Sequence, residues 1–100
     1  MDFENITVVN NEEKKRFEVT LEDELALMQY QRAGKNIIFT HTEVPEAFEG
    51  KGIAGKMAHT ALEFAKDNGL KVQALCPYVA HYVREHPEYH SITWGYENKS

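Results

Sequence analysis

The chain has 100 residues, of which 42% are hydrophobic and 27% charged, with a formal net charge of −5. These values predict one folded domain over residues 1–100 and exclude a disordered chain. The negative charge argues against nonspecific nucleic-acid binding, and no apolar run is long enough to cross a membrane. Because the chain starts without a signal-peptide pattern and has a single cysteine, we expect a cytoplasmic setting.

The first half of the sequence predicts four antiparallel strands, over residues 5–10, 15–21, 24–32 and 35–44. The third is ambiguous, because Leu25, Ala26 and Met28 would also suit a helix. A strand is favoured, since its neighbours are strands and residues 33–36 (Ala-Gly-Lys-Asn) suit a hairpin turn. Pro45 cannot donate to a sheet, so the fourth strand should end there.

The second half predicts helix, strand and helix. A long helix over residues 52–68 has Ile53, Met57, Ala61 and Phe64 at helical spacing, and Gly69 suits the position after its end. A fifth strand over residues 70–76 precedes a short helix that opens at Pro77. Pro87 ends that helix, and beyond Tyr89 the pattern is weak: Ile92, Trp94 and Tyr96 suit either a short edge strand or a packed tail. The predicted fold class is therefore α/β (α+β), with one mixed, mainly antiparallel five-stranded sheet.

A glycine-rich turn, Glu-Gly-Lys-Gly-Ile-Ala-Gly at residues 49–55, leads directly into the long helix. Backbone N–H groups at a helix start attract anions, and glycines let a phosphate approach closely. Lys51 and Lys56 could add positive charge. The turn is neither a Rossmann fingerprint, because an antiparallel meander precedes it, nor a P-loop. An alternative is that these glycines only shape a loop.

The turn also resembles a known motif. Residues Glu49 to Ala54 are similar to the acyl-CoA pyrophosphate loop of the GNAT acetyltransferases, Gln/Arg-x-x-Gly-x-Gly/Ala, although Glu49 replaces the usual Gln or Arg. The order of elements fits as well, without the helices between the first two strands and without a clear final hairpin. The segments HTEVP, GKGIAGKM, ALCPYV and HPEY are similar to segments of a small, truncated GNAT-like group of N-acetyltransferase domain proteins. The resemblance extends from Phe17 to Tyr89.

This resemblance implies that acetyl-CoA is the co-substrate and that an amine accepts the acetyl group. The residues expected to bind the co-substrate are Val44, Glu49, Gly50, Lys51, Gly52, Ile53, Ala54, Gly55, Lys56 and Tyr78. The acceptor amine is left open. The elements that usually form the wall of the acceptor pocket are missing. A second copy of the chain could supply that wall, so a homodimer is a further expectation.

Cys76 is the first candidate for chemistry. It stands at the end of the fifth strand and directly before Pro77, where the partial positive charge of a helix start favours a thiolate. The resemblance implies that this cysteine accepts the acetyl group or lies beside it. The alternative is a buried cysteine that serves as a small hydrophobic residue.

Tyr82 and His41 complete the predicted catalytic set. The resemblance implies that Tyr82 protonates the leaving thiolate, and His41, two residues before Glu43, could act as general base. Packing for Tyr82 and a solvent-facing position for His41 are the alternatives. No metal site is predicted, because His81, His86 and His90 are irregularly spaced and no second cysteine exists.

Three functions remain open at this point. The first is an acetyl-CoA-binding N-acetyltransferase that acts by direct transfer or through an acetylated Cys76. The second is a noncatalytic CoA-binding or interaction module, which the short chain and Glu49 favour. The third is a thiol-based redox sensor without CoA affinity.

Overall fold

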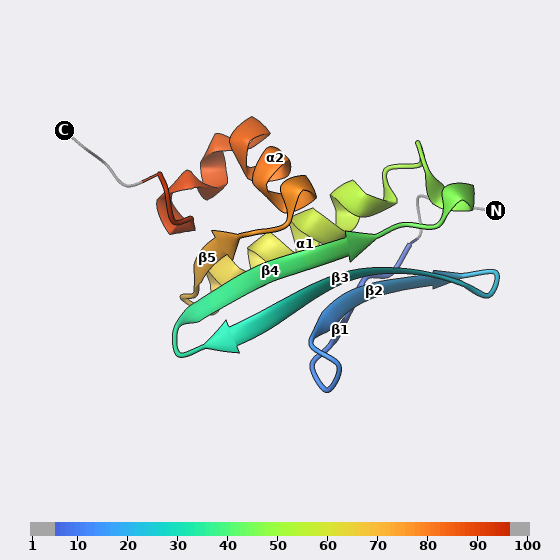
Figure 1. Cartoon of the computed structure of the whole chain (residues 1–100), viewed down its shortest axis with the longest axis horizontal. Helices are drawn as coiled ribbons and strands as arrows, with labels where there is room; N and C mark the ends of the chain where they lie inside the picture. Colours follow the sequence, from blue (N-terminus) through green and yellow to red (C-terminus); the bar gives the residue numbers. More distant parts are fainter. Residues whose placement is uncertain (1–5, 97–100) are drawn as a thin grey trace.

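The computed structural model describes residues 6–96, and its centre is a five-stranded sheet with the order β1-β2-β3-β4-β5 (Figure 1). The strands are β1 (Val9–Asn11), β2 (Arg16–Leu21), β3 (Glu24–Ala33), β4 (Asn36–Glu43) and β5 (Lys71–Ala74). The first four pair antiparallel, and β4 and β5 pair parallel. The mixed, mainly antiparallel sheet is therefore confirmed, and the ambiguous third segment is a strand.

Within residues 6–96, two α-helices and two short 3₁₀ helices accompany the sheet. They are η2 (Glu46–Phe48), α1 (Ile53–Asp67), α2 (Pro77–Glu85) and η3 (Pro87–Ile92). Figure 1 shows α1 running along the sheet behind β4, with α2 beside it. Both helices contribute buried residues to the same core, so a single helical layer covers the sheet. The predicted helices after the fourth and fifth strands are confirmed.

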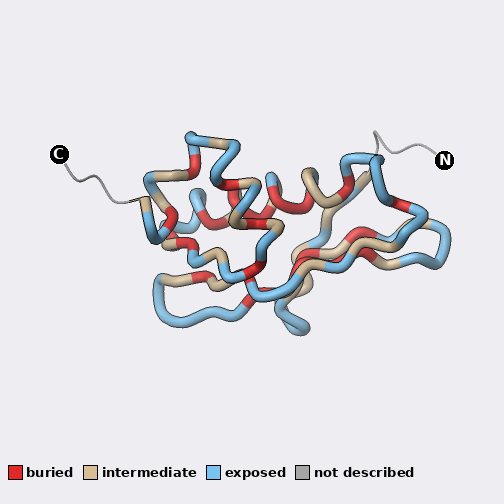
Figure 2. Tube along the Cα trace, turned by 45° about the horizontal axis from the view of Figure 1, so that its top comes forward, coloured by how far each residue is buried: buried red, intermediate tan, exposed pale blue. Residues whose placement is uncertain are grey.

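The core lies between α1 and one face of the sheet. The buried residues of α1 that meet that face are Ile53, Met57, Ala58, Ala61, Leu62 and Ala65, and Phe64 is partly buried. Phe17 and Met28, which are paired neighbours on β2 and β3, are 1% and 0% exposed. Figure 2 shows the buried stretches as red segments of the strands and helices. Hydrophobic burial on alternate strand positions and on one helix stripe thus orients α1 relative to β4.

An extra residue interrupts the regular pairing of β4. Gln29 pairs with His41 and the next residue of β3, Tyr30, pairs with Phe39, so Thr40 has no opposite partner. This is a β-bulge, which bends a strand and changes the direction of the residues that follow. The bulge divides β4 into a first part that pairs with β5 and a second part that does not.

Several predicted boundaries change. Within the described residues the first strand begins only at Val9, and the rest of the predicted 5–10 strand is irregular, with Asn5 outside the described range. The fifth strand ends at Ala74, two residues early. Beyond Tyr89, where the sequence left an edge strand and a packed tail open, the described residues form the end of η3 and a single bridge between Thr93 and Val72. Within residues 6–96, no helix has the length and apolar character to span a bilayer.

Candidate functional site

The start of α1 is open to an anion. Its N-cap, Gly52, has a φ of 78°, a conformation that suits glycine, and it supplies no side-chain cap. The first intrahelical bond runs from the N–H of Lys56 to the oxygen of Gly52, at 3.0 Å. The preceding N–H groups therefore have no acceptor within the helix. Since the first turn contains no acidic residue, the positive end of the helix dipole is not neutralised by the helix itself.

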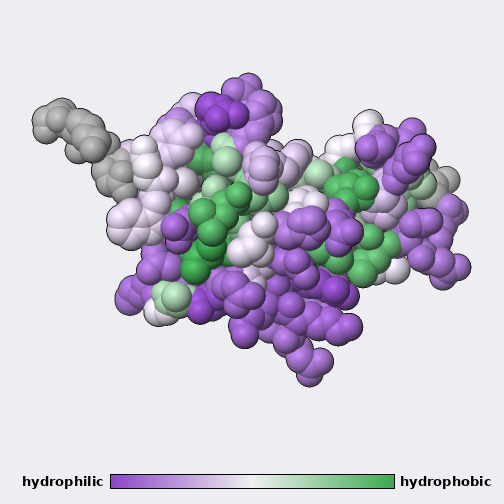
Figure 3. All heavy atoms as spheres, in the orientation of Figure 1, coloured by the Kyte–Doolittle hydropathy of each residue, from purple (hydrophilic) through white to green (hydrophobic). Residues whose placement is uncertain are grey.

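Two adjoining hollows lie beside this helix start. The first, which we name the loop hollow, has a volume of about 410 Å³ and is lined by Val44, Phe48, Glu49, Gly50, Gly52, Ile53, Ala54, Gly55 and Tyr78. The second, the gap hollow, has a volume of about 390 Å³ and is lined by Thr40, His41, Thr42, Val44, Glu49, Ala54, Cys76, Pro77 and Tyr78. Figure 3 shows the surface hollowed between α2 and the segment of η2. The shared residues make the two hollows neighbours.

The gap hollow lies where β4 and β5 separate. Their parallel pairing ends at Phe39 and Ala74. The carbonyl oxygen of Phe39 then accepts from both Leu75 N (3.0 Å) and Cys76 N (2.9 Å), which closes the paired region. From there β4 continues past its bulge, whereas the chain after β5 turns into α2 at Pro77. The separation leaves space between the two strand ends.

Cys76 lies in this space and is 3% exposed. Its sulfur is 3.1 Å from the hydroxyl oxygen of Thr42 on the second part of β4. It is also the N-cap of α2, as the sequence predicts. Cys76 is thus buried, yet it borders a hollow that a ligand could enter.

His41 is exposed and borders the same hollow. Its Nε2 lies 3.4 Å from a carboxylate oxygen of Glu43, two residues further along β4. Because alternate strand residues point to opposite faces, His41 and Glu43 face away from the side that Thr42 faces. The gap hollow therefore borders both faces of β4, with Cys76 toward one and His41 toward the other.

The two candidate tyrosines of α2 are placed differently. Tyr78 lines both the loop hollow and the gap hollow. Tyr82 is among the lining residues of neither; its ring stacks on His86 at a centroid distance of 3.8 Å. Burial raises the pKa of Tyr78 above its ordinary value, so its phenol keeps its proton at neutral pH. Tyr78, which the sequence predicted as a binding residue, has the better position for a proton donor.

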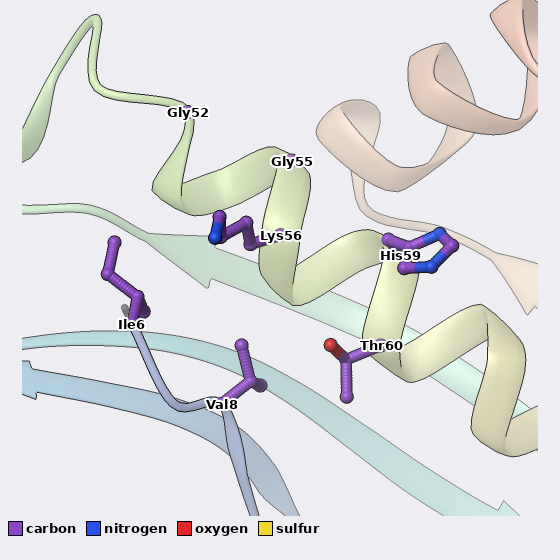
Figure 4. Close-up of a pocket in the computed structure, with 7 residues that line it drawn as sticks. All are labelled: Ile6, Val8, Gly52, Gly55, Lys56, His59 and Thr60. Atoms are coloured by element: carbon purple, nitrogen blue, oxygen red, sulfur yellow. The ribbon is translucent and has the colours of Figure 1, made fainter. Parts of the chain in front are cut away.

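A third hollow lies on the other side of α1. This N-terminal hollow, of about 460 Å³, is lined by Ile6, Val8, Gly52, Gly55, Lys56, His59 and Thr60 (Figure 4). Sequence reasoning predicted Lys56 as a binding residue but missed Ile6, Val8 and Thr60. Lys56 and Thr60 are four residues apart and so lie on the same face of α1. This spacing could have indicated that Thr60 lines the hollow together with Lys56.

The remaining predicted residues divide between surface and core. Lys51 is exposed, and Ile53 is 1% exposed, so Ile53 borders the loop hollow mainly through its backbone. Among residues 6–96, no three His, Cys, Asp or Glu side chains form a group that could hold a metal ion.

A meander, a glycine-started helix, a parallel fifth strand and a second helix define the class of this protein. Residues 16–92 match the family model described as GCN5-related N-acetyl-transferase, and the chain belongs to that family. The predicted family is therefore confirmed.

Curated relatives are similar over most of the chain. Protein NATD1 of Mus musculus is 38% identical over 85 residues, which cover 82% of this chain and 77% of that protein. Protein NATD1 of Xenopus tropicalis is 36% identical over 86 residues, covering 83% and 79%. The solution structure of a GCN5-like candidate N-acetyltransferase from Staphylococcus aureus superposes with a TM-score of 0.74 and 23% identity, over 95% of this chain and 94% of that one. The last comparison supports the fold.

Proposed function

We propose that this chain is an acetyl-CoA-dependent N-acetyltransferase that works in the loop and gap hollows. One observation supports this most: the open start of α1 and the buried sulfur of Cys76 border two hollows that share Val44, Glu49, Ala54 and Tyr78. An anion-binding helix start at one end and a reactive region at the other suit a ligand with a pyrophosphate and a thioester.

The residues of the loop hollow fit such a ligand. Gly50 and Gly52, with φ values of 77° and 78°, leave the backbone accessible where a pyrophosphate would approach. Val44 and Phe48 provide apolar wall for a pantetheine chain. Glu49 is the exception, because a carboxylate beside a pyrophosphate weakens its binding. Bound acetyl-CoA would supply the activated acetyl group.

In the gap hollow, residues of this chain move two protons. The attacking amine nitrogen forms a bond to the acetyl carbon and loses a proton, for which the exposed Nε2 of His41 is the candidate acceptor. Glu43, at 3.4 Å, would stabilise the resulting imidazolium. As the carbon–sulfur bond breaks, the sulfur of the leaving group takes a proton from the phenol of Tyr78. Subsequent proton exchange with solvent restores both residues.

Cys76 favours a second route for the same reaction. Its sulfur borders the gap hollow and is hydrogen-bonded with Thr42 at 3.1 Å. In this route the thiol loses its proton, its sulfur forms a bond to the acetyl carbon, and the CoA thiolate leaves with a proton. The amine nitrogen then forms a bond to the acetyl carbon, the bond from that carbon to the Cys76 sulfur breaks, and the proton lost by the amine restores the Cys76 thiol.

A substitution at Ala54 tests the anion site without weakening the helix. Ala54 stands in the first turn of α1, where an acidic side chain stabilises a helix by about 0.3–1 kcal/mol. Ala54→Glu should therefore keep or raise the melting temperature while it repels a pyrophosphate. We expect calorimetry to show saturable CoA binding for the wild type and at least a tenfold weaker affinity for the variant. A folded wild type that binds no CoA would exclude this function.

The second candidate function is a noncatalytic CoA-binding module. It is favoured by Glu49, whose position in both hollows introduces negative charge where the co-substrate would lie. Release of free CoA from acetyl-CoA, measured with and without a panel of amines, separates the two candidates. Amine-dependent release supports the transferase, whereas binding without release supports the module.

A further inference from the structure

Glu49 brings a negative charge to the border between the loop hollow and the gap hollow. Among the described residues that line the gap hollow it is the only acidic one, and none of them is Lys or Arg. Glu49 is exposed, and within residues 6–96 its carboxylate forms neither an ion pair nor a hydrogen bond. An uncompensated negative charge therefore faces the space in which the acetyl group would be transferred.

The backbone of Glu49 is held in place by its neighbours. Figure 1 shows the chain passing from β4 through η2 to the start of α1. The preceding residue, Phe48, is 1% exposed, and the backbone N–H of Glu49 donates to the carbonyl oxygen of Glu46 at 3.1 Å. A buried ring and a backbone hydrogen bond thus keep the Glu49 side chain at the border of the two hollows.

The co-substrate does not account for this carboxylate. Glu49 repels a pyrophosphate, and a thioester near Cys76 has no net charge for it to attract. The acetyl acceptor is the other molecule that must enter the gap hollow, because Cys76 and His41 both border it. An acceptor with a positive charge would be attracted by the same carboxylate that repels the co-substrate.

The attacking nitrogen cannot carry that positive charge. It needs a free lone pair to form a bond to the acetyl carbon, and a nearby carboxylate favours the protonated form, which has none. A monoamine would pair with Glu49 through its only nitrogen and stay protonated. In an acceptor with two amino groups, one ammonium pairs with Glu49 and cancels its charge, while the other nitrogen attacks as the free base and gives its proton to His41.

We infer that the acetyl acceptor is a small aliphatic diamine or polyamine, and that Glu49 sets this specificity by binding the ammonium group that does not react. This inference rests on the proposed function. An ammonium has three N–H donors, and a carboxylate accepts them in charge-assisted hydrogen bonds. The gap hollow, of about 390 Å³, offers room for a short aliphatic chain between the two amino groups.

The test compares putrescine, a diamine, with butylamine and aminobutanol, which keep its carbon chain but have a single amino group. Release of free CoA from acetyl-CoA should give the wild type a kcat/KM about tenfold higher for putrescine than for either monoamine, as expected for a hydrogen bond to a charged group. In Glu49→Gln, kcat/KM should fall about tenfold for putrescine and rise for the monoamines. The affinity for CoA should stay equal or increase, because a charge that repels the pyrophosphate is removed. A variant with a damaged fold would lose both activities and CoA binding.

Glu46→Gln is the matched control. Glu46 is an exposed glutamate on η2, close to Glu49 in the sequence, and it lines none of the three hollows. This variant should keep the wild-type preference for putrescine. An equal loss of preference in Glu46→Gln would show that only the overall negative charge attracts the acceptor, and it would overturn the role inferred for Glu49.

The outcomes separate the inference from the proposed function. If the wild type acetylates the monoamines as fast as putrescine, or acetylates other amines but not putrescine, the inference fails while the transferase proposal stands. A preference for putrescine that survives in Glu49→Gln would also overturn the inference. If the protein binds no CoA, the proposed function fails and the inference fails with it.

An NMR titration of the CoA-bound protein adds a readout that does not depend on turnover. The amide signals of His41 and Gly50, which border the hollows beside Glu49, should shift saturably on addition of putrescine to the wild type. The same addition should shift them much less in Glu49→Gln. Signals that do not shift in the wild type would exclude a diamine site at Glu49.

Discussion

The hydroxyl oxygen of Thr42 lies 3.1 Å from the sulfur of Cys76, past the point where β4 and β5 stop pairing. This contact joins the second part of β4 to the start of α2 across the gap. It fixes the cysteine at the border of the hollow and gives its sulfur a polar partner in a buried place. A substitution at each of the two residues tests the role of this contact.

We expect wild-type protein incubated with acetyl-CoA to gain the mass of one acetyl group, and Cys76→Ser to gain none. Thr42→Val keeps the shape but removes the hydrogen bond, so acetylation should slow by about tenfold. Intact-mass spectrometry over time measures both. An unmodified wild type, together with full amine turnover by Cys76→Ser, would instead support direct transfer.

Tyr78→Phe and Tyr82→Phe form a matched pair on α2. Tyr78 borders the gap hollow and keeps its proton at neutral pH, so its loss should lower kcat by about 100-fold with little change in CoA affinity. Tyr82 is stacked on His86 and lies outside both hollows, so Tyr82→Phe should change mainly the stability of the protein. Steady-state kinetics and thermal melts of the two variants show which tyrosine acts in the reaction and which one acts in stability. A larger fall in kcat for Tyr82→Phe would return the proton donor to the residue that the resemblance implied.

Gly55→Ala should stabilise the protein and weaken binding together. Alanine is favoured over glycine in a helix by about 0.8–1.0 kcal/mol, and the added methyl would lie 3.7 Å from the Tyr78 hydroxyl, an ordinary contact. The methyl would nevertheless narrow the loop hollow, so we expect a higher melting temperature and about tenfold weaker CoA binding.

The control for this variant is Gly69→Ala, at the other end of α1. Gly69 has a φ of 66°, so alanine there should cost about 1–2 kcal/mol of unfolding free energy and leave CoA affinity unchanged. Unchanged affinity in Gly55→Ala would mean that the ligand does not contact this turn.

Tyr89 connects η3 to α1. Its hydroxyl donates to Glu63 at 2.8 Å and lies 3.1 Å from Nδ1 of His59, while its side chain is buried. Tyr89→Phe removes both contacts and should cost about 1–2 kcal/mol in the free energy of unfolding. Urea denaturation at neutral pH measures this cost. A variant as stable as the wild type would show that the two hydrogen bonds contribute nothing net.

The same residue predicts a dependence on alkaline pH. Burial and the Glu63 carboxylate raise the pKa of Tyr89 far above the ordinary 10.0. The folded state then keeps a proton that the unfolded state loses above about pH 10, so unfolding free energy falls as pH rises beyond that value. The fall should be less steep in Tyr89→Phe, in which Tyr30, Tyr78 and Tyr82, whose pKa values are also raised, still contribute. If the unfolding free energies of the wild type and of Tyr89→Phe fell equally steeply with pH, this would contradict the raised pKa of Tyr89.

Local patterns in the sequence were sufficient for most of the fold. Strand-forming patterns predicted β2 and β3, and in the structure Ala26, Met28 and Tyr30 of β3 are buried on the α1 side. Glycine and proline chemistry predicted the ends of the helices: Gly52 caps α1 and Pro77 opens α2. These signals are local, because they depend on backbone freedom and on the period of each element.

The sequence alone did not predict the contacts between segments that are distant along the chain. The bulge at Thr40 depends on how β4 pairs with β3, and the end of β5 depends on Phe39 accepting two backbone hydrogen bonds. The N-terminal hollow exists because the segment with Ile6 and Val8 lies beside α1. Pairing register and the packing of distant segments are set by burial over the whole domain, so a local pattern does not contain them.

The sequence by itself thus determined the order of elements, the glycine-started helix and the position of Cys76 at a helix start. Only the tertiary structure decided which groups share a hollow: Tyr78 rather than Tyr82 at the gap, Thr42 on the Cys76 sulfur, and Lys56 with Thr60 beside an apolar wall. The physical reason is that element type follows from short-range backbone and burial preferences. The neighbours of a side chain follow from how the separate elements pack into one core.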